Sequence, residues 1–340
     1  MVVLPPSHRV TTGDRTRAGR DASLTRPGTS GASRIIFAVI LLLSFLFTTS
    51  GCSNSKTTNE VILYCAQDQV FAEPILADFT RETGIKVRAI FDSEAVKSVG
   101  MANRLLAERD RPQCDVFWGN EELRTRQLAA GNVWRETNGW ATFGHRSRRL
   151  VLNTNRLSLA DAPKSFLDLT NASWRGKVAI AYPLFGTTAT HFLALRQKWG
   201  DAGWQAWCRA LAENKPFLVD GNSVVVKLVG KGEALVGITD SDDIAGGQQE
   251  GLPIAPAPMN ADTLLIPNTV AVVRGAPHAA AAQKLFEYLQ RPQVLRRLIA
   301  GSSLEDDSIL PRTDTLRPDW PLLLKDLEPA TGELRQIFLR

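Results

Sequence analysis

Short runs of apolar residues alternate along this chain with segments in which apolar residues recur every three or four positions. The continuous apolar run Val61–Cys65 is typical of a strand buried on both faces. Lys86–Phe91, which is rich in apolar residues, and the short segment Asp115–Trp118 predict two further strands. Between these runs, the spacing of apolar residues predicts helices at Phe71–Phe79 and Ser98–Asp110. Strands and helices that alternate at this spacing predict parallel βαβ units.

The same alternation continues through the second half of the chain. Strands are predicted at Arg148–Asn153, Lys177–Ala181, Phe217–Val219 and Ala234–Thr239, and Leu264–Val273 is a long apolar stretch interrupted by Pro267. Helices are predicted from Gly186 to about Trp199, and at Ser223–Gly230, His278–Gln290 and Gln293–Ala300. We therefore expect an α/β protein with mostly parallel sheets flanked by helices. A length of 340 residues favours two domains, at roughly 150 residues each.

The first 51 residues differ from the rest of the chain in charge. They carry six arginines and two aspartates, whereas the remaining 289 residues hold 34 basic and 33 acidic side chains. The net charge of +5 therefore belongs mainly to this leader. A nearly neutral body argues against binding to nucleic acid, because nucleic-acid binders gather basic residues on their folded surface.

The leader contains an apolar run, residues 35–47, directly after Arg34. The run is too short to span a bilayer, which takes about 20 residues, but it fits the apolar core of a secretory signal. It leads into Thr49-Ser50-Gly51-Cys52, which resembles the lipobox of bacterial lipoproteins. We expect residues 1–51 to be a cleaved leader, Cys52 to carry lipid, and residues 52–59 to tether an exported body to a membrane. The alternative is an uncleaved anchor.

Polar residues follow several predicted strands, where open parallel sheets bind ligands. Gly186-Thr187-Thr188 opens a helix, and free N–H groups with neighbouring hydroxyls bind anions at such a place. Ser93 and Ser223 stand near the start of two other predicted helices, and Asn120 follows a third strand. For the serines and threonines, ordinary helix capping is the alternative interpretation.

Acidic residues gather at Asp240-Ser241-Asp242-Asp243, after another strand. Carboxylates this close repel one another unless a cation is present, and hard cations or an ammonium group suit oxygen ligands. A solvated acidic turn is the alternative. Loops at the strand ends are expected to meet across a cleft, with Asp68 on the other side from these carboxylates. The pattern then favours a zwitterion or a metal–anion pair as the ligand. Arg146, Arg148 and Arg149 are expected to be solvated, with pairing to a ligand anion as the alternative.

Six motifs give the chain a family resemblance. They are Tyr64-Cys65-Ala66-Gln67-Asp68-Gln69, Gly84-Ile85-Lys86-Val87, Asp115-Val116-Phe117-Trp118, Trp174-Arg175-Gly176-Lys177, Gly232-Glu233-Ala234 and Ile266-Pro267-Asn268-Thr269-Val270-Ala271. With them, residues 60–298 resemble the extracellular solute-binding proteins (family 1) of bacterial ABC importers, and among these the iron(III)-transport type. The resemblance implies a type II fold of two hinged lobes, residues 60–150 with 266–340 and residues 151–265, joined by crossing strands.

The resemblance also implies a ligand set for comparison. Family members that bind ferric iron hold it with a histidine, a glutamate and two adjacent tyrosines, together with an anion. At those places this chain has Asp68, Asn120 (with Glu121 one step on) and Asp242-Asp243. None of its three tyrosines are adjacent, so phenolate ligation of iron is not expected. If a metal is bound, Asp68, Asp242 and Asp243 are the candidates, and no cofactor is expected.

The resemblance implies a binding protein rather than an enzyme. Its partners are then a small anionic or zwitterionic solute, or a metal–anion pair, and the permease subunits of an ABC importer. An enzyme on the same two-lobed fold is one alternative, with Cys65 or Cys114 as the nucleophile to consider. A solute-binding lobe of a sensor is another. No Cys/His spacing suggests zinc.

Overall fold

The computed structural model describes residues 59–92, 97–306 and 315–339. The predicted leader, Cys52 and Ser93 lie outside the described residues. Within the described segments, no helix combines the length and apolar character that crossing a membrane requires.

The first lobe is built on three parallel strands, as the apolar runs predict. They are β1 (Glu60–Cys65), β2 (Lys86–Phe91) and β3 (Val116–Gly119), with β1 in the middle. Helices α2 (Gln69–Thr83), α3 (Lys97–Ala107) and α4 (Glu122–Ala130) alternate with these strands along the chain. α4 was not predicted, because its apolar residues are too few to give a helical pattern.

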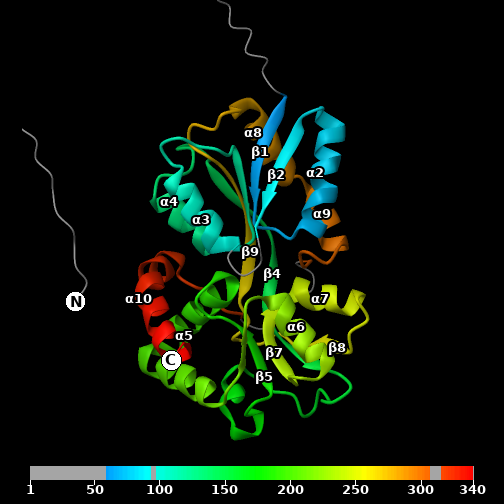
Figure 1. The fold of residues 1–340 in the computed structure, drawn as a ribbon, viewed down its shortest axis with the longest axis vertical. Helices are drawn as coiled ribbons and strands as arrows, with labels where there is room; N and C mark the ends of the chain where they lie inside the picture. The colour runs from blue at the N-terminus through cyan, green and yellow to red at the C-terminus, as the bar shows by residue number, and fades with distance from the viewer. Residues whose placement is uncertain (1–58, 93–96, 307–314, 340) are drawn as a thin grey trace, which may run out of the picture. The chain divides into compact units, whose positions relative to one another are not determined.

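Two long strands connect the lobes. β4 (Trp140–Asn153) pairs with β9 (Leu265–Val272) up to Ser147, and from Arg148 onward it pairs with β7 (Val236–Asp240) of the second lobe. β9 also pairs with β3, so the nine described strands form one continuous sheet. Figure 1 shows β4 and β9 running from the upper group of elements into the lower one.

The second lobe repeats the α/β plan. Its strands are β5 (Val178–Ala181), β6 (Phe217–Val219), β7 and β8 (Ile254–Pro256). Its helices are α5 (Gly186–Glu213), α6 (Asn222–Lys231) and α7 (Ser241–Gln249), with the short 3-10 turns η1 (Leu167–Thr170) and η2 (Ala172–Trp174). β5 lies parallel to β6 and β7. Gly200, with φ of 71°, interrupts α5 where the sequence predicts the end of its first part.

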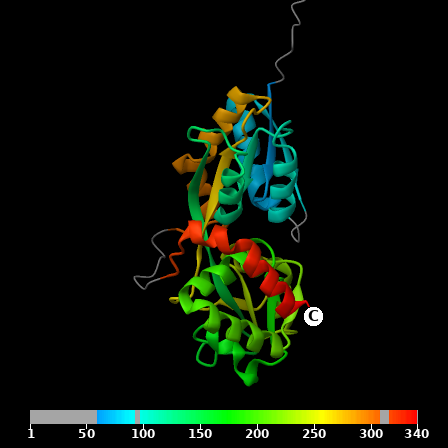
Figure 2. The ribbon, with the colours of Figure 1, turned by 90° about the vertical axis from the view of Figure 1, so that its left-hand side faces the viewer.

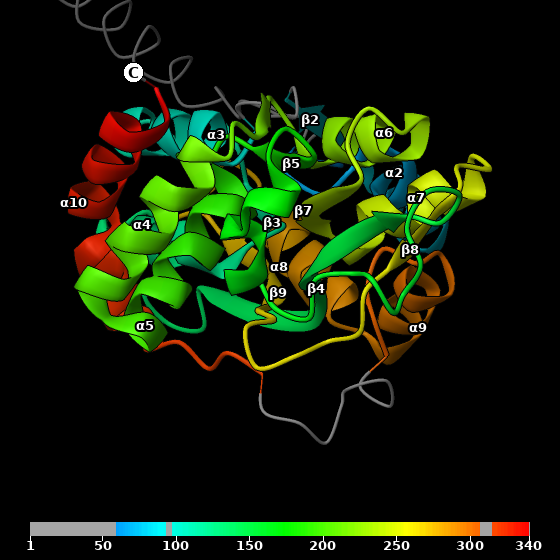
Figure 3. The ribbon, with the colours of Figure 1, turned by 90° about the horizontal axis from the view of Figure 1, so that it is seen from below.

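The C-terminal helices divide between the lobes. α8 (Ala279–Leu289) and α9 (Pro292–Ala300) bury their apolar residues in the first-lobe core around β1. α10 (Trp320–Phe338) instead shares the core of α5, with the rings of Phe192 and Phe338 centred 6.1 Å apart. Figures 1 and 3 both show α10 beside α5.

The place of α10 corrects one expectation from the sequence. We expected all of residues 266–340 in the first lobe, but the apolar face of α10 packs against the second. Figure 2 shows this helix lying across the second-lobe elements. An apolar stripe predicts that a helix is packed, and it carries no information about which lobe the helix covers.

Candidate functional site

The carboxyl ends of strands from both lobes meet around one small pocket of about 60 Å³. Residues that follow β1, β3, β5, β6 and β7 line it, as the strand-end rule predicts. Six of the predicted ligand-binding residues lie in its lining: Asp68, Asn120, Thr187, Thr188, Asp242 and Asp243. Ser223 is not among the lining residues, and its neighbour Asn222 takes that place at the start of α6.

A buried guanidinium, that of Arg148 in β4, organises the second-lobe side of the pocket. Its Nη1 lies 2.8 Å from Asp240 Oδ1 and donates to Asn222 Oδ1 at 2.9 Å. Its Nη2 donates to Thr188 Oγ1 at 3.1 Å. The side chain of Arg148 is 0% exposed, so the expectation that this arginine is solvated is wrong.

The threonine hydroxyls belong to the same network. Thr187 Oγ1 donates to Asp240 Oδ2 at 2.8 Å, and Thr188 Oγ1 accepts from Arg148. Neither hydroxyl is therefore held ready for a ligand. The N–H groups in the first turn of α5, unlike these hydroxyls, can bind a ligand. The first N–H groups of any helix lack intrahelical acceptors, and the N-cap residue, Phe185, supplies no side-chain hydrogen bond.

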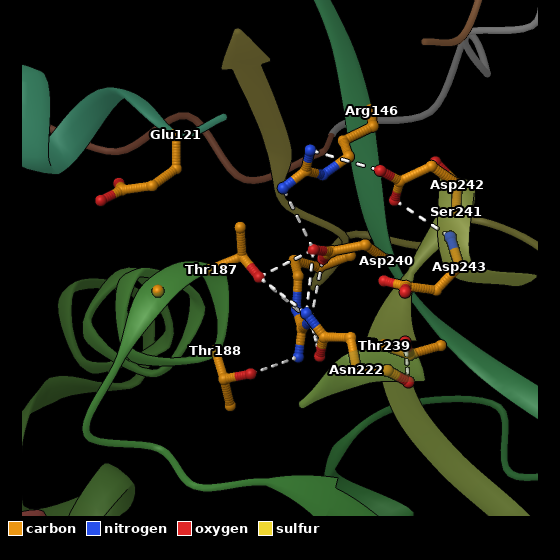
Figure 4. A network of polar contacts seen from close by, with 12 residues as sticks. Glu121, Arg146, Thr187, Thr188, Asn222, Thr239, Asp240, Ser241, Asp242 and Asp243 are labelled. Atoms are coloured by element: carbon orange, nitrogen blue, oxygen red, sulfur yellow. Dashed lines mark hydrogen bonds and ion pairs between the residues drawn. The ribbon is translucent and has the colours of Figure 1, made fainter. Parts of the chain in front are cut away.

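Arg146 is a second buried arginine, and it lies between two carboxylates. Its Nη2 is 3.3 Å from Asp240 Oδ2, and its Nη1 is 3.3 Å from Asp242 Oδ2 (Figure 4). The side chain is 3% exposed, and it forms part of the pocket wall. Nε of Arg146 has no hydrogen-bond partner among the described residues. The solvated interpretation is wrong for this arginine too.

The carboxylates of the network differ in their pKa values. Burial alone raises the pKa of Asp240, but the charges of Arg148 and Arg146 outweigh burial and hold this pKa below its usual range. For Asp242, burial together with repulsion from Asp240 and Asp68 overcomes the attraction of Arg146 and raises the pKa to about 7. Asp240 therefore stays ionised at neutral pH, while Asp242 is partly protonated.

Glu121, which stands beside Asn120, lies outside the pocket lining and has a structural role. Its carboxylate caps α4 by accepting from the N–H groups of Leu123 and Arg124. It also accepts from Thr190 Oγ1 of α5 at 3.2 Å, which links the two lobes. Asn120, rather than Glu121, lines the pocket.

Comparison with known proteins identifies the family. Residues 62–300 match the bacterial extracellular solute-binding proteins. The chain belongs to this family. The expectation drawn from the six motifs is therefore confirmed, and so is the two-lobed α/β fold.

Several known solute-binding proteins are similar to this chain. The major ferric iron-binding protein of Neisseria meningitidis is 28% identical over 193 residues, which cover 51% of this chain and 56% of that protein. The Fe(3+)-binding periplasmic protein of Serratia marcescens is 30% identical over 218 residues, covering 59% and 62%. The chain thus spans less than two thirds of the length of these curated relatives. The structure of iron-bound HitA from Pseudomonas aeruginosa shares the fold, with a TM-score of 0.72 at 18% identity, covering 82% of this chain and 99% of HitA.

Three residues of this solute-binding protein's pocket network were not predicted as site residues: Arg146, Arg148 and Asn222. The arginines come from β4, one of the two strands that connect the lobes, and the pocket is lined by residues of both lobes. That position was the available signal. A cluster of three arginines within four residues nevertheless looks like solvated charge, since arginine is rarely fully buried without a partner.

A conservative variant tests the network. Thr188→Val should lower the free energy of unfolding by about 1 kcal/mol, because Arg148 loses one hydroxyl acceptor in a buried setting. Chemical denaturation followed by circular dichroism measures this change. Thr154→Val, at an exposed turn position, is the matched control and should stay within about 0.5 kcal/mol of the parent. Equal stability of the two variants would show that the Thr188 hydroxyl does not support Arg148.

Proposed function

We propose that this protein is the exported, lipid-anchored solute-binding component of an ABC importer, and that it captures a small anionic or zwitterionic solute by hinge closure. Family membership supports a solute-binding role. The pocket supports hinge closure, because residues of both lobes line it and two crossing strands connect the lobes. Anchoring through Cys52 and delivery to permease subunits complete the proposal.

One observation carries the preference for an anionic group. Arg146 is almost completely buried, forms part of the pocket wall and makes two ion pairs at 3.3 Å. A guanidinium carries five N–H donors, so these two ion pairs leave donors that can bind a ligand. Gly186, Thr187 and Thr188, at the N-terminus of α5, line the same pocket. A guanidinium and a helix N-terminus both bind carboxylate or phosphate oxygens. Asp68 and Asp243 would then face a positive group of a zwitterion.

A metal–anion pair is the second candidate solute. Two of the relatives are named for ferric iron, and the carboxylate oxygens of Asp240, Asp242 and Asp243 lie within 4.8 Å of one another. A pair of phenolates is not available for such an ion. Of the three tyrosines, Tyr64 bonds to Glu108 and Tyr288 to Glu82, and only Tyr182 lines the pocket.

The cysteines support binding rather than catalysis. Cys65 and Cys114 are buried and absent from the pocket lining. Burial raises the pKa of Cys114 well above its usual range, so the reactive thiolate is not formed at neutral pH. Neither residue therefore suits the role of a nucleophile in this pocket.

Native mass spectrometry of the full chain, purified from its host membrane, tests the proposed function. A trapped, unreacted solute should appear as an added mass. Adding that solute to the empty protein should reduce the radius of gyration in small-angle scattering. A saturating solute that leaves the scattering curve unchanged argues against capture by hinge closure. A membrane-bound Cys52→Ser variant argues against the lipid anchor.

A variant at the pocket mouth separates anion binding from helix stability. Phe185 lines the pocket and is the N-cap of α5. In Phe185→Asp, the carboxylate should occupy the N–H groups that the solute anion needs, so affinity for the trapped solute should fall roughly ten- to hundredfold. Thermal stability should not fall, because aspartate is a favourable cap.

Phe185→Asn is the matched control for this test. Asparagine also caps helices well but brings no charge, so its affinity should lie between those of the parent and of Phe185→Asp. Isothermal calorimetry measures all three. Equal affinities of the Asp and Asn variants would show that no anionic group binds at the N-terminus of α5.

A further inference from the structure

The acidic side of the pocket has the geometry of a hard-cation site, and a side chain of the protein already fills it. Oxygens of Asp240, Asp242 and Asp243 lie within 4.8 Å of one another. The guanidinium of Arg146 lies between Asp240 and Asp242 at 3.3 Å from each, as Figure 4 shows. The positive charge that these carboxylates require is therefore supplied from β4.

We infer that Arg146 is the specificity-determining residue of the pocket, a built-in cation that takes the place of a metal ion and leaves the pocket selective for a metal-free anionic group. The inference rests on the proposed solute-binding function and names the class of solute more narrowly. It separates this chain from relatives that are named for ferric iron.

The surroundings of Arg146 hold the guanidinium in place. Its backbone is fixed in the β4–β9 ladder, opposite Ile266. Burial disfavours its charge, but the carboxylates of Asp242 and Asp240 more than compensate and raise the pKa of Arg146, so it remains charged. A metal ion coordinated by the same oxygens would bring a second positive charge next to a buried one, where the repulsion is screened much less than in bulk water.

The neighbouring arginine cannot take over this role. Arg148 already donates through Nη1 and Nη2 to Asp240, Asn222 and the two threonines, and among the described residues only its Nε lacks a partner. Arg146 makes only its two ion pairs within the described part of the chain, and its Nε is without a partner. Removal of Arg146 alone therefore takes away the positive charge between Asp240 and Asp242: Asp242 loses this ion pair, while Asp240 keeps Arg148.

The test compares metal binding by the wild-type chain with that of two variants. Arg146→Met removes the charge at similar length, and Arg146→Lys keeps it. Each protein is titrated with Mn²⁺ under electron paramagnetic resonance, and metal content is measured after gel filtration. The same proteins are then offered Fe³⁺ as its nitrilotriacetate complex. Circular dichroism confirms that each variant is folded.

Arg146→Met is expected to bind one metal ion at least about a hundredfold more tightly than the wild type, and Arg146→Lys to behave like the wild type. A further Asp242→Asn change in the Arg146→Met background should abolish the gained site. Stoichiometric metal binding by the wild type that Asp242→Asn removes would overturn the inference, even if Arg146→Met does not fold. A folded Arg146→Met that gains no metal would overturn it as well.

The outcome is separable from that of the proposed function. A wild-type chain that binds metal at Asp242 and closes on it keeps its role in solute capture but contradicts the built-in cation. A chain that excludes metal until Arg146 is removed, yet carries and closes on no solute, keeps the inference about Arg146 and contradicts solute capture.

Discussion

Arg148→Met is expected to lower the free energy of unfolding by about 3–5 kcal/mol. The substitution removes a fully buried guanidinium that lies 2.8 Å from Asp240 and leaves that carboxylate short of a counter-charge. Breaking one half of a buried ion pair costs about this much, because the remaining charge is neither hydrated nor paired. Arg146, at 3.3 Å from Asp240, offsets only part of the loss. Urea denaturation of the solute-free protein measures the change.

A double variant identifies the cause of this loss. Asp240→Asn in the Arg148→Met background should recover part of the lost stability, since the unpaired charge is then gone. Arg156→Met, which removes an exposed arginine that bonds to a backbone carbonyl, is the control and should cost about 0.5 kcal/mol or less. If Arg148→Met unfolds at the same urea concentration as Arg156→Met, the Arg148–Asp240 pair does not contribute to the stability of the folded protein.

Asp242→Asn should stabilise the solute-free protein at pH 8 and leave it unchanged near pH 4. The pKa of Asp242 is raised from 3.8 to about 7 in the folded state, so the folded chain binds more protons than the unfolded chain between these values. The contribution of this carboxyl is therefore fully favourable below pH 4 and is lost as the pH rises through 7. Each pKa unit corresponds to about 1.4 kcal/mol, so the gain at pH 8 is at most about 4 kcal/mol.

Thermal unfolding of the wild type and Asp242→Asn across pH 4 to 8 measures this effect. A stability difference between wild type and Asp242→Asn that does not vary with pH would show that Asp242 is ionised throughout.

Local patterns determine much of this protein. Apolar runs mark β1, β3 and β5, because a strand buried on both faces needs apolar side chains in succession. The rule that ligands bind beyond the carboxyl ends of parallel strands brings Asp68, Asn120 and Asp242 to one pocket without any knowledge of the packing. These features depend on neighbours in the chain and on strand direction, both of which the sequence displays.

The tertiary structure decided how the charges in that pocket are used. Arg148 and Asp240 are 92 positions apart, and they meet because β4 pairs with β7 in the register Arg148↔Asp240. No local pattern distinguishes a buried, paired arginine from a solvated one, since the energy that favours burial comes from a distant carboxylate. The lobe against which α10 packs and the burial of Arg146 depend in the same way on residues that are distant in the sequence and meet only in the folded chain.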